Sequence, residues 1–167
     1  MGKSSLQAKP KAVDLHMGIG KRDNAAIAEV LATALADSFS LYVKTLGVHW
    51  NIVGPGFFGL HRLTEAQYQD LAMAIDATAE RMRALGHIAP AAFGDFAEKS
   101  CVDSRTTIAS AKNMLKELIA DNESIARRLR GAVKIADKGD DVFTADFLTA
   151  RIGQHEKNVW MLKSITA

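Results

Sequence analysis

A chain of 167 residues, 48% of them hydrophobic and 24% charged, has the composition of one domain that can bury a real core. Its net charge of +2 is too small to indicate a nucleic-acid partner for the whole surface, and Cys101, its single cysteine, excludes an internal disulfide framework. No membrane span or secretory signal is visible, so we expect a soluble protein of the reducing cytoplasm.

Residues 1–22 form a basic segment without a sustained apolar period. It carries five basic residues against Asp14 alone, and a proline and three glycines interrupt it. We predict a flexible basic arm over 1–22 and a helical domain over 23–167.

Two long helices are predicted in the first half of the domain. Apolar residues recur at intervals of three and four from Asp23, the expected N-cap, to about Asn51, before a Gly-Pro-Gly sequence at 54–56. The same period continues from Phe58 to about Leu85, where Gly86 is placed to stop the helix.

A long connection and two further helices complete the domain. The connection runs from Gly86 to Arg105 and has room for a short helix over 91–99. Long helices are predicted from about Thr107 to Ala136 and from Val142 to Ile165. The expected fold is all-α, a ferritin-like four-helix bundle with a short extra helix in the long crossover between the second and third helices.

Five side chains that can bind a transition metal cluster in the first two helices. They are His49, His61, Glu65, Asp76 and Glu80. The last four are spaced by 4, 11 and 4 residues, close to whole helical turns, so they lie on one stripe. At about 1.5 Å per residue, the first and last of the stripe are roughly 28 Å apart and cannot share a metal within one chain.

The stripe is symmetric about a point between Asp70 and Leu71. An antiparallel pairing of two copies across a two-fold axis would place His61 and Glu65 of one copy opposite Glu80 and Asp76 of the other. Each such pair of chains would make two equivalent sites.

The ligand set favours iron. Two imidazoles and three carboxylates suit iron(II) and leave positions for water or an oxidant, whereas a structural zinc site more often contains cysteines. The alternative is that these are ordinary solvent-facing helix residues, with His49 and His61 in local hydrogen bonds. The symmetric spacing of the whole set favours the metal site.

The stretch from Val48 to Gly86 closely resembles the Dps family of mini-ferritins. The resemblance rests on His-Trp-Asn at 49–51, Phe-Phe at 57–58, Leu-His at 60–61, Asp76, Ala-Glu-Arg at 79–81 and Leu-Gly at 85–86. The helical layout extends it from about Asn24 to the C-terminus. Glu65 departs from the aspartate common in the family, and Glu-x-x-His pairs of larger ferritins are absent.

The resemblance implies a ferroxidase, an enzyme that oxidises iron(II) to iron(III). Its di-iron site would take His49, His61 and Glu65 from one subunit and Asp76 and Glu80 from the neighbour. The family forms shells of twelve subunits, usually uses hydrogen peroxide rather than dioxygen, and stores ferric mineral inside. Trp50 would act as a radical trap, with a buried core aromatic as the alternative.

Two further groups of residues have candidate roles. The resemblance places an acidic iron-entry pore at Asp137, Asp141 and Asp146, with Asp140 as a further candidate, and helix capping is the alternative for each. Lys3, Lys9 and Lys11 are the candidates for non-specific DNA binding by the arm, and a solubilising tail is the alternative. Two other functions stay open for the whole protein: a DNA-compacting nucleoid protein with secondary iron oxidation, and a purely structural helical oligomer.

Overall fold

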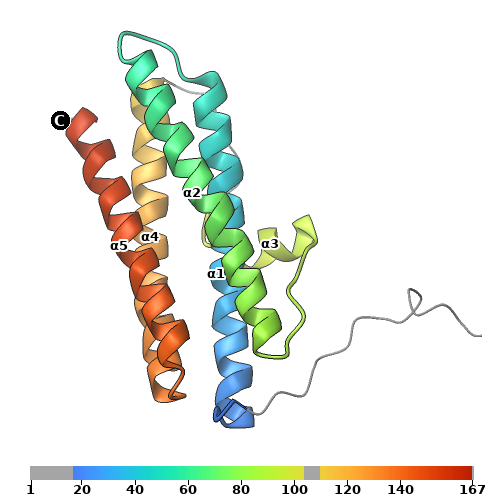
Figure 1. Ribbon diagram of the computed structural model, residues 1–167. Coiled ribbons are helices and arrows are strands. Elements are labelled where there is room, and N and C mark those ends of the chain that lie inside the picture. The colour runs from blue at the N-terminus through green and yellow to red at the C-terminus, as the bar shows by residue number, and fades with distance from the viewer. Residues whose placement is uncertain (1–16, 104–109, 167) are drawn as a thin grey trace, which may run out of the picture.

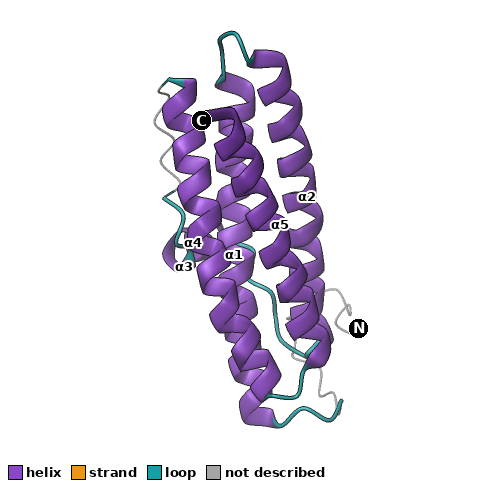
Figure 2. Ribbon diagram, turned by 90° about the vertical axis from the view of Figure 1, so that its left-hand side faces the viewer, coloured by secondary structure: helices purple, strands orange, loops and turns teal. Residues whose placement is uncertain are grey.

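The computed structural model describes residues 17–103 and 110–166, and within these ranges the chain contains five helices and no strand (Figure 2). The helices are α1 Lys21–Asn51, α2 Phe57–Ala84, α3 Phe93–Lys99, α4 Ala111–Lys138 and α5 Val142–Thr166. The predicted all-α class is confirmed.

The four long helices form two hairpins that pack side by side. α1 packs against α2, α4 packs against α5, and α1 also contacts α4 along the middle of the bundle (Figure 1). The short α3 lies in the crossover between the hairpins and contacts α1. This is the predicted ferritin-like four-helix bundle with its extra helix.

The helix ends agree with the prediction at most positions and differ at the start of α1. The helix begins at Lys21 after Gly20, so Asp23 lies in its first turn and is not the N-cap. Its carboxylate there still interacts favourably with the helix dipole. Gly86, with φ of 89°, ends α2 as expected, and the amide of His87 donates to the carbonyl of Met82 at 3.0 Å. The predicted start near Thr107 lies outside the described residues.

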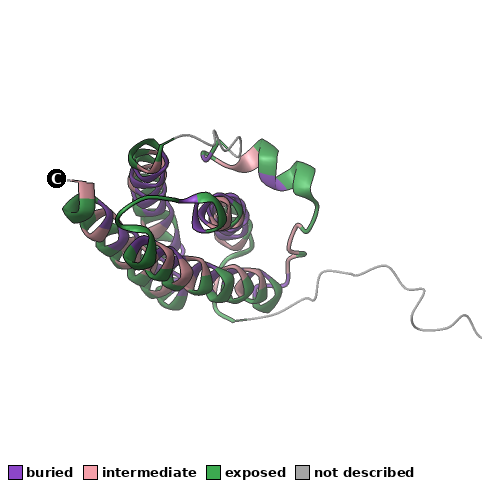
Figure 3. Cartoon of the chain, turned by 90° about the horizontal axis from the view of Figure 1, so that it is seen from above, coloured by how far each residue is buried: buried purple, intermediate pink, exposed green. Residues whose placement is uncertain are grey.

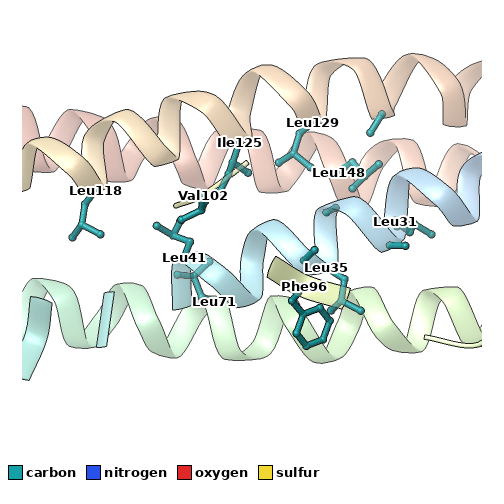
Figure 4. Packing of buried hydrophobic residues seen from close by; sticks show 14 of the residues in the cluster. Leu31, Leu35, Leu41, Leu71, Phe96, Val102, Leu118, Ile125, Leu129 and Leu148 are labelled. Atoms are coloured by element: carbon teal, nitrogen blue, oxygen red, sulfur yellow. The ribbon is translucent and has the colours of Figure 1, made fainter. Parts of the chain in front are cut away.

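The core fills the space between the hairpins (Figures 3 and 4). Its fully buried side chains come from every long helix and include Leu31, Leu41, Leu71, Leu118 and Leu148. Burying each such leucine contributes about 1.5–3 kcal/mol. The shared core fixes α2, the helix that carries most of the candidate ligands, against α1.

α1 is the one helix of the described chain that is long and apolar enough to span a membrane by length and composition. Of its most apolar 18-residue window, 61% is buried inside the protein. α1 contacts α2, α3 and α4, so it is the central helix of the bundle. Its hydropathy is accounted for by this packing.

Polar contacts join helices that share little apolar surface. α2 touches α5 only slightly, and two ion pairs hold them together. Arg151 binds Asp70 through two hydrogen bonds of 3.0 and 2.7 Å, and Arg81 lies 2.7 Å from Asp141. The fork-like pair of Arg151 with Asp70 fixes the register of the two helices as well as stabilising them.

A buried polar cluster joins α4 to α5. His155 is 1% exposed, and its Nδ1 lies 2.8 Å from Oδ1 of Asn122. Burial, together with the positive charge of Arg151, outweighs the attraction of Asp70 and lowers the pKa of His155 to about 4. The imidazole is therefore neutral at pH 7 and donates through Nδ1 to the amide oxygen.

Two glycines of the second hairpin allow a matched test of the packing. A Cβ on Gly139 would lie 2.8 Å from Cδ1 of Ile27 and 3.1 Å from Cβ of Asp23, whereas a Cβ on Gly131 would meet nothing within 4 Å. Gly139→Ala should therefore lower the free energy of unfolding by about 1–3 kcal/mol. Gly131→Ala, inside α4, should raise it by about 0.5–1 kcal/mol. Denaturant titrations at equal protein concentration measure both, and stabilisation by both variants would contradict the close approach at Gly139.

Candidate metal centre

The turn between α1 and α2 brings the two candidate histidines together. His49 lies in the last turn of α1 and His61 in the second turn of α2. Gly54, with φ of 120°, allows the chain to reverse between them, and the amide of Phe57 then donates to its carbonyl at 3.0 Å. The imidazole rings stack with centroids 3.7 Å apart and an angle of 18° between their planes.

Each histidine is oriented by the backbone of the other. Nδ1 of His49 lies 2.9 Å from the carbonyl oxygen of His61, and Nδ1 of His61 lies 3.1 Å from that of His49. A carbonyl oxygen only accepts, so both Nδ1 atoms must carry the proton. In a neutral imidazole the lone pair then belongs to Nε2, the usual arrangement of a histidine that binds a metal.

Two residues that the sequence analysis did not single out support this pair. The hydroxyl oxygen of Thr64 lies 3.2 Å from Nδ1 of His49, and the ring of Tyr68 packs edge-on against His49 with centroids 5.1 Å apart. Thr64 and Tyr68 follow His61 by three and seven residues, which places them on the same side of α2. That spacing is the signal from which they could have been found.

The three candidate carboxylates differ in their surroundings. Glu65 is half-buried, and its Oε2 lies 2.6 Å from Nη1 of Arg62 in an ion pair on the surface of α2. Asp76 and Glu80 are exposed and have no partner among the described residues. α2 runs from the turn at the top of Figure 1 toward the opposite end of the bundle, so these two acids lie far from the histidines.

The single chain brings His49 and His61 together and leaves the acids of α2 apart from them. Within residues 17–103 and 110–166, no three His, Cys, Asp or Glu side chains converge on a point that could hold a metal ion. The site shared between two chains, which the mirror symmetry of the α2 stripe indicates, stays a prediction.

Trp50 does not occupy the core. It is 69% exposed in the single chain, which contradicts the alternative of a buried core aromatic. In the described part of the chain it makes no ring contact with either histidine, although it follows His49 directly.

The predicted pore acids divide into two kinds. Asp137 and Asp146 are exposed, and so is Asp140, whose φ is 60°. Asp141 is 3% exposed and accepts hydrogen bonds from Arg81 and from the amide and hydroxyl of Thr144, at the start of α5. Burial alone raises the pKa of Asp141, but these hydrogen bonds outweigh it and lower the pKa. Asp141 is thus a helix cap in the single chain, as in the alternative stated for it.

Comparison with known proteins identifies the family. A model of the ferritin-like domain matches residues 28–167. The DNA protection during starvation protein of Brevibacillus brevis is 35% identical over 138 residues, which cover 83% of this chain and 93% of the relative. The chain belongs to the Dps family of ferritin-like proteins. The predicted resemblance is confirmed.

Solved Dps structures have the same fold as this Dps-family chain. The crystal structure of a Dps protein from Bacillus brevis has a TM-score of 0.85 at 32% identity, over 89% of this chain and all of the other. A Dps protein from Vibrio cholerae O1, described as a member of a broad superfamily of ferritin-like diiron-carboxylate proteins, has a TM-score of 0.86 at 27% identity and covers 96% of this chain. A low temperature-induced protein of Nostoc sp. is 37% identical over 152 residues, 90% of this chain and 85% of its own.

Proposed function

We propose that this chain is a ferroxidase and iron-storage protein. Twelve copies form a hollow shell. Iron(II) is oxidised at interfaces between two copies, each of which contains two equivalent sites. Each site takes His49, His61 and Glu65 from one copy and Asp76 and Glu80 from the other. Hydrogen peroxide is the oxidant, and the ferric product is held as mineral inside the shell. The proposed compartment is the cytoplasm, in keeping with a single cysteine.

The reciprocal hydrogen bonds of His49 and His61 carry the proposal. With both Nδ1 atoms donating to backbone carbonyls, both rings have Nε2 left for a metal. The same two bonds would satisfy a pair of structural histidines, so the support for a metal lies in two stacked rings that both keep Nε2 for it, together with the mirrored acids of α2. The accepting carbonyls belong to the backbone of α1 and α2, so the two ligands are oriented before iron arrives.

The exposed acids of α2 supply the other half of the proposed site. Asp76 and Glu80 have no partner within the described part of the chain, and they lie one turn apart on one face of the helix. A second copy in antiparallel contact would bring them toward the histidines. Their negative charge favours the +3 state of iron over the +2 state, because it offsets the added positive charge.

The proposed reaction balances without releasing a radical. Two iron(II) ions each give one electron, and one hydrogen peroxide molecule takes up both electrons and two protons to form two water molecules. Because iron is a substrate here, the chain itself binds and orients the ions and stabilises their oxidised charge. The exposed Asp137 and Asp146 are proposed to attract iron(II) to the shell.

Removal of the acids tests the proposal directly. Asp76→Ala with Glu80→Ala should oxidise iron(II) at the rate of the buffer, because each site loses two of its three carboxylates. Iron(II) is added anaerobically, then hydrogen peroxide, and ferric absorbance is followed while light scattering reports the size of the assembly. Glu123→Ala with Glu156→Ala removes the same charge from the surface of α4 and α5 and should retain the wild-type rate.

The experiment also separates the other proposed classes of function. A wild-type protein that oxidises iron no faster than buffer would overturn the ferroxidase proposal and favour a structural oligomer. Activity that survives the loss of both acids would place the site elsewhere in the chain.

DNA binding is a second candidate function, supported by the basic arm and by the name that the Brevibacillus brevis relative carries. Lys3, Lys9 and Lys11 lie outside the described residues. If many subunits carry such lysines, their weak contacts with DNA phosphates act together and bind DNA with high avidity. The iron site has more specific support from the geometry.

Deletion of residues 1–15 should abolish retardation of DNA in a gel at low salt and leave iron oxidation unchanged, because the arm contributes no proposed ligand. Replacement of Lys3, Lys9 and Lys11 by glutamine keeps the length of the arm and should have the same effect. Retardation that persists in both variants would assign DNA binding to another surface or to none.

A further inference from the structure

Tyr68 is the phenol that touches the histidine pair. Its ring meets that of His49 edge-on, with centroids 5.1 Å apart and planes at 74°. The ring of Tyr42 follows behind it, with centroids 6.2 Å apart. A row of rings thus leads from the stacked histidines through Tyr68 to Tyr42, toward the middle of α1 and α2.

A site that holds only one iron(II) ion lacks one of the electrons needed to reduce hydrogen peroxide to water. Splitting hydrogen peroxide into two water molecules requires two electrons, and one iron(II) supplies only one. Without a second electron donor, the reaction of one iron(II) with hydrogen peroxide yields iron(III), hydroxide and a hydroxyl radical. The proposed site therefore needs another reductant whenever it holds one iron.

We propose, on the basis of the function proposed above, that Tyr68 supplies this second electron through His49. In the balanced step, iron(II), the Tyr68 phenol, hydrogen peroxide and one proton give iron(III), a tyrosyl radical and two water molecules. Iron loses one electron, the phenol loses one electron and its proton, and the O–O bond of the peroxide breaks. No hydroxyl radical is released.

The surroundings of Tyr68 fit this role better than those of Trp50. Tyr68 is half-buried, and its ring contacts the rings of His49 and Tyr42, both on α1. Trp50 is 69% exposed and contacts neither histidine ring within the described ranges. Tyr68 thus has a direct ring contact with a candidate ligand, which Trp50 lacks among the described residues.

The test uses the assembled protein loaded anaerobically with one iron(II) per site, followed by one equivalent of hydrogen peroxide. Spin trapping measures released hydroxyl radical, electron paramagnetic resonance detects the tyrosyl radical, and peptide mass spectrometry locates oxidised residues. Tyr68→Phe keeps the ring and should lose the tyrosyl signal and release several times more trapped radical than wild type. Tyr42→Phe removes a phenol that does not touch His49 and should behave as wild type.

Further measurements distinguish the role of Tyr68 from the alternatives. With two irons per site, Tyr42→Phe and wild type should oxidise iron at the same rate, because no outside electron is needed. Equal hydroxyl radical from Tyr68→Phe and wild type at one iron per site would overturn the role of Tyr68, as would an increase seen only in Trp50→Phe. A wild-type protein that fails to oxidise iron at two irons per site would overturn the proposed function itself, and this inference with it.

Discussion

Coexpression of two inactive variants should restore about one quarter of the wild-type iron-oxidising sites, if two chains share each site across a two-fold axis. One variant is His61→Ala, and the other is Asp76→Ala with Glu80→Ala. Each variant alone forms only defective sites, because every site takes its histidines from one copy and two acids from the other.

The recovery follows from how the two kinds of chain pair. Random pairing makes about half of the two-fold pairs mixed, and a mixed pair has one site with both defects and one site with neither. Different affinity tags on the two variants allow mixed shells to be purified, and ferric absorbance after peroxide addition counts the active sites. Shells mixed after assembly, without exchange of subunits, are the control and should stay inactive.

A site built within one chain predicts no recovery at all, since each chain carries one of the two defects. Mixed shells that stay inactive would therefore contradict the shared site, even if both acids are needed for activity.

Acidification should destabilise the protein through His155 by about 3 kcal/mol per chain in total. Its pKa falls from the usual 6.5 to about 4 on folding, and each pKa unit corresponds to about 1.4 kcal/mol. Because the pKa is lower in the folded state, the unfolded chain binds the proton first. Stability is lost as the pH falls from about 6.5, and the loss is complete below about 4.

His155→Gln isolates this contribution. Glutamine keeps a hydrogen-bond donor for Oδ1 of Asn122 and does not titrate. The free energy of unfolding of the variant should fall less than that of wild type between pH 7 and pH 5, when both are measured at the same protein concentration. Parallel pH profiles for the two proteins would show that the His155 ring is not the group responsible.

The fold was predictable from the sequence because long amphipathic helices leave a strong periodic signal. The crossover was long enough to need a helix of its own, and α3 begins two residues after the predicted start. The start of α1 was missed because Gly20 provides no side-chain cap, so Asp23, the first residue after it that can cap a helix with its side chain, gave the stronger signal.

The site was only partly predictable. Spacing along α2 indicated which side chains share a face, but the stacking of His49 on His61 depends on the path of the turn between the helices. Tyr68 was missed because a tyrosine at helical spacing is indistinguishable from a core residue until its neighbour is known. Asp141 was ambiguous for a similar reason, since an acid before a helix has the same sequence pattern as a pore residue and as a cap.

The ion pair of Asp70 with Arg151 has a consequence for the assembly. An α-helix turns by about 100° per residue, so Asp70 lies on the side of α2 opposite the stripe of candidate ligands. Two hydrogen bonds hold it there to α5 of the same chain. The proposed pairing of two copies through the stripe therefore leaves this ion pair outside their contact. The contact that fixes α5 on α2 thus lets a single folded bundle present Asp76 and Glu80 to solvent before a second copy arrives.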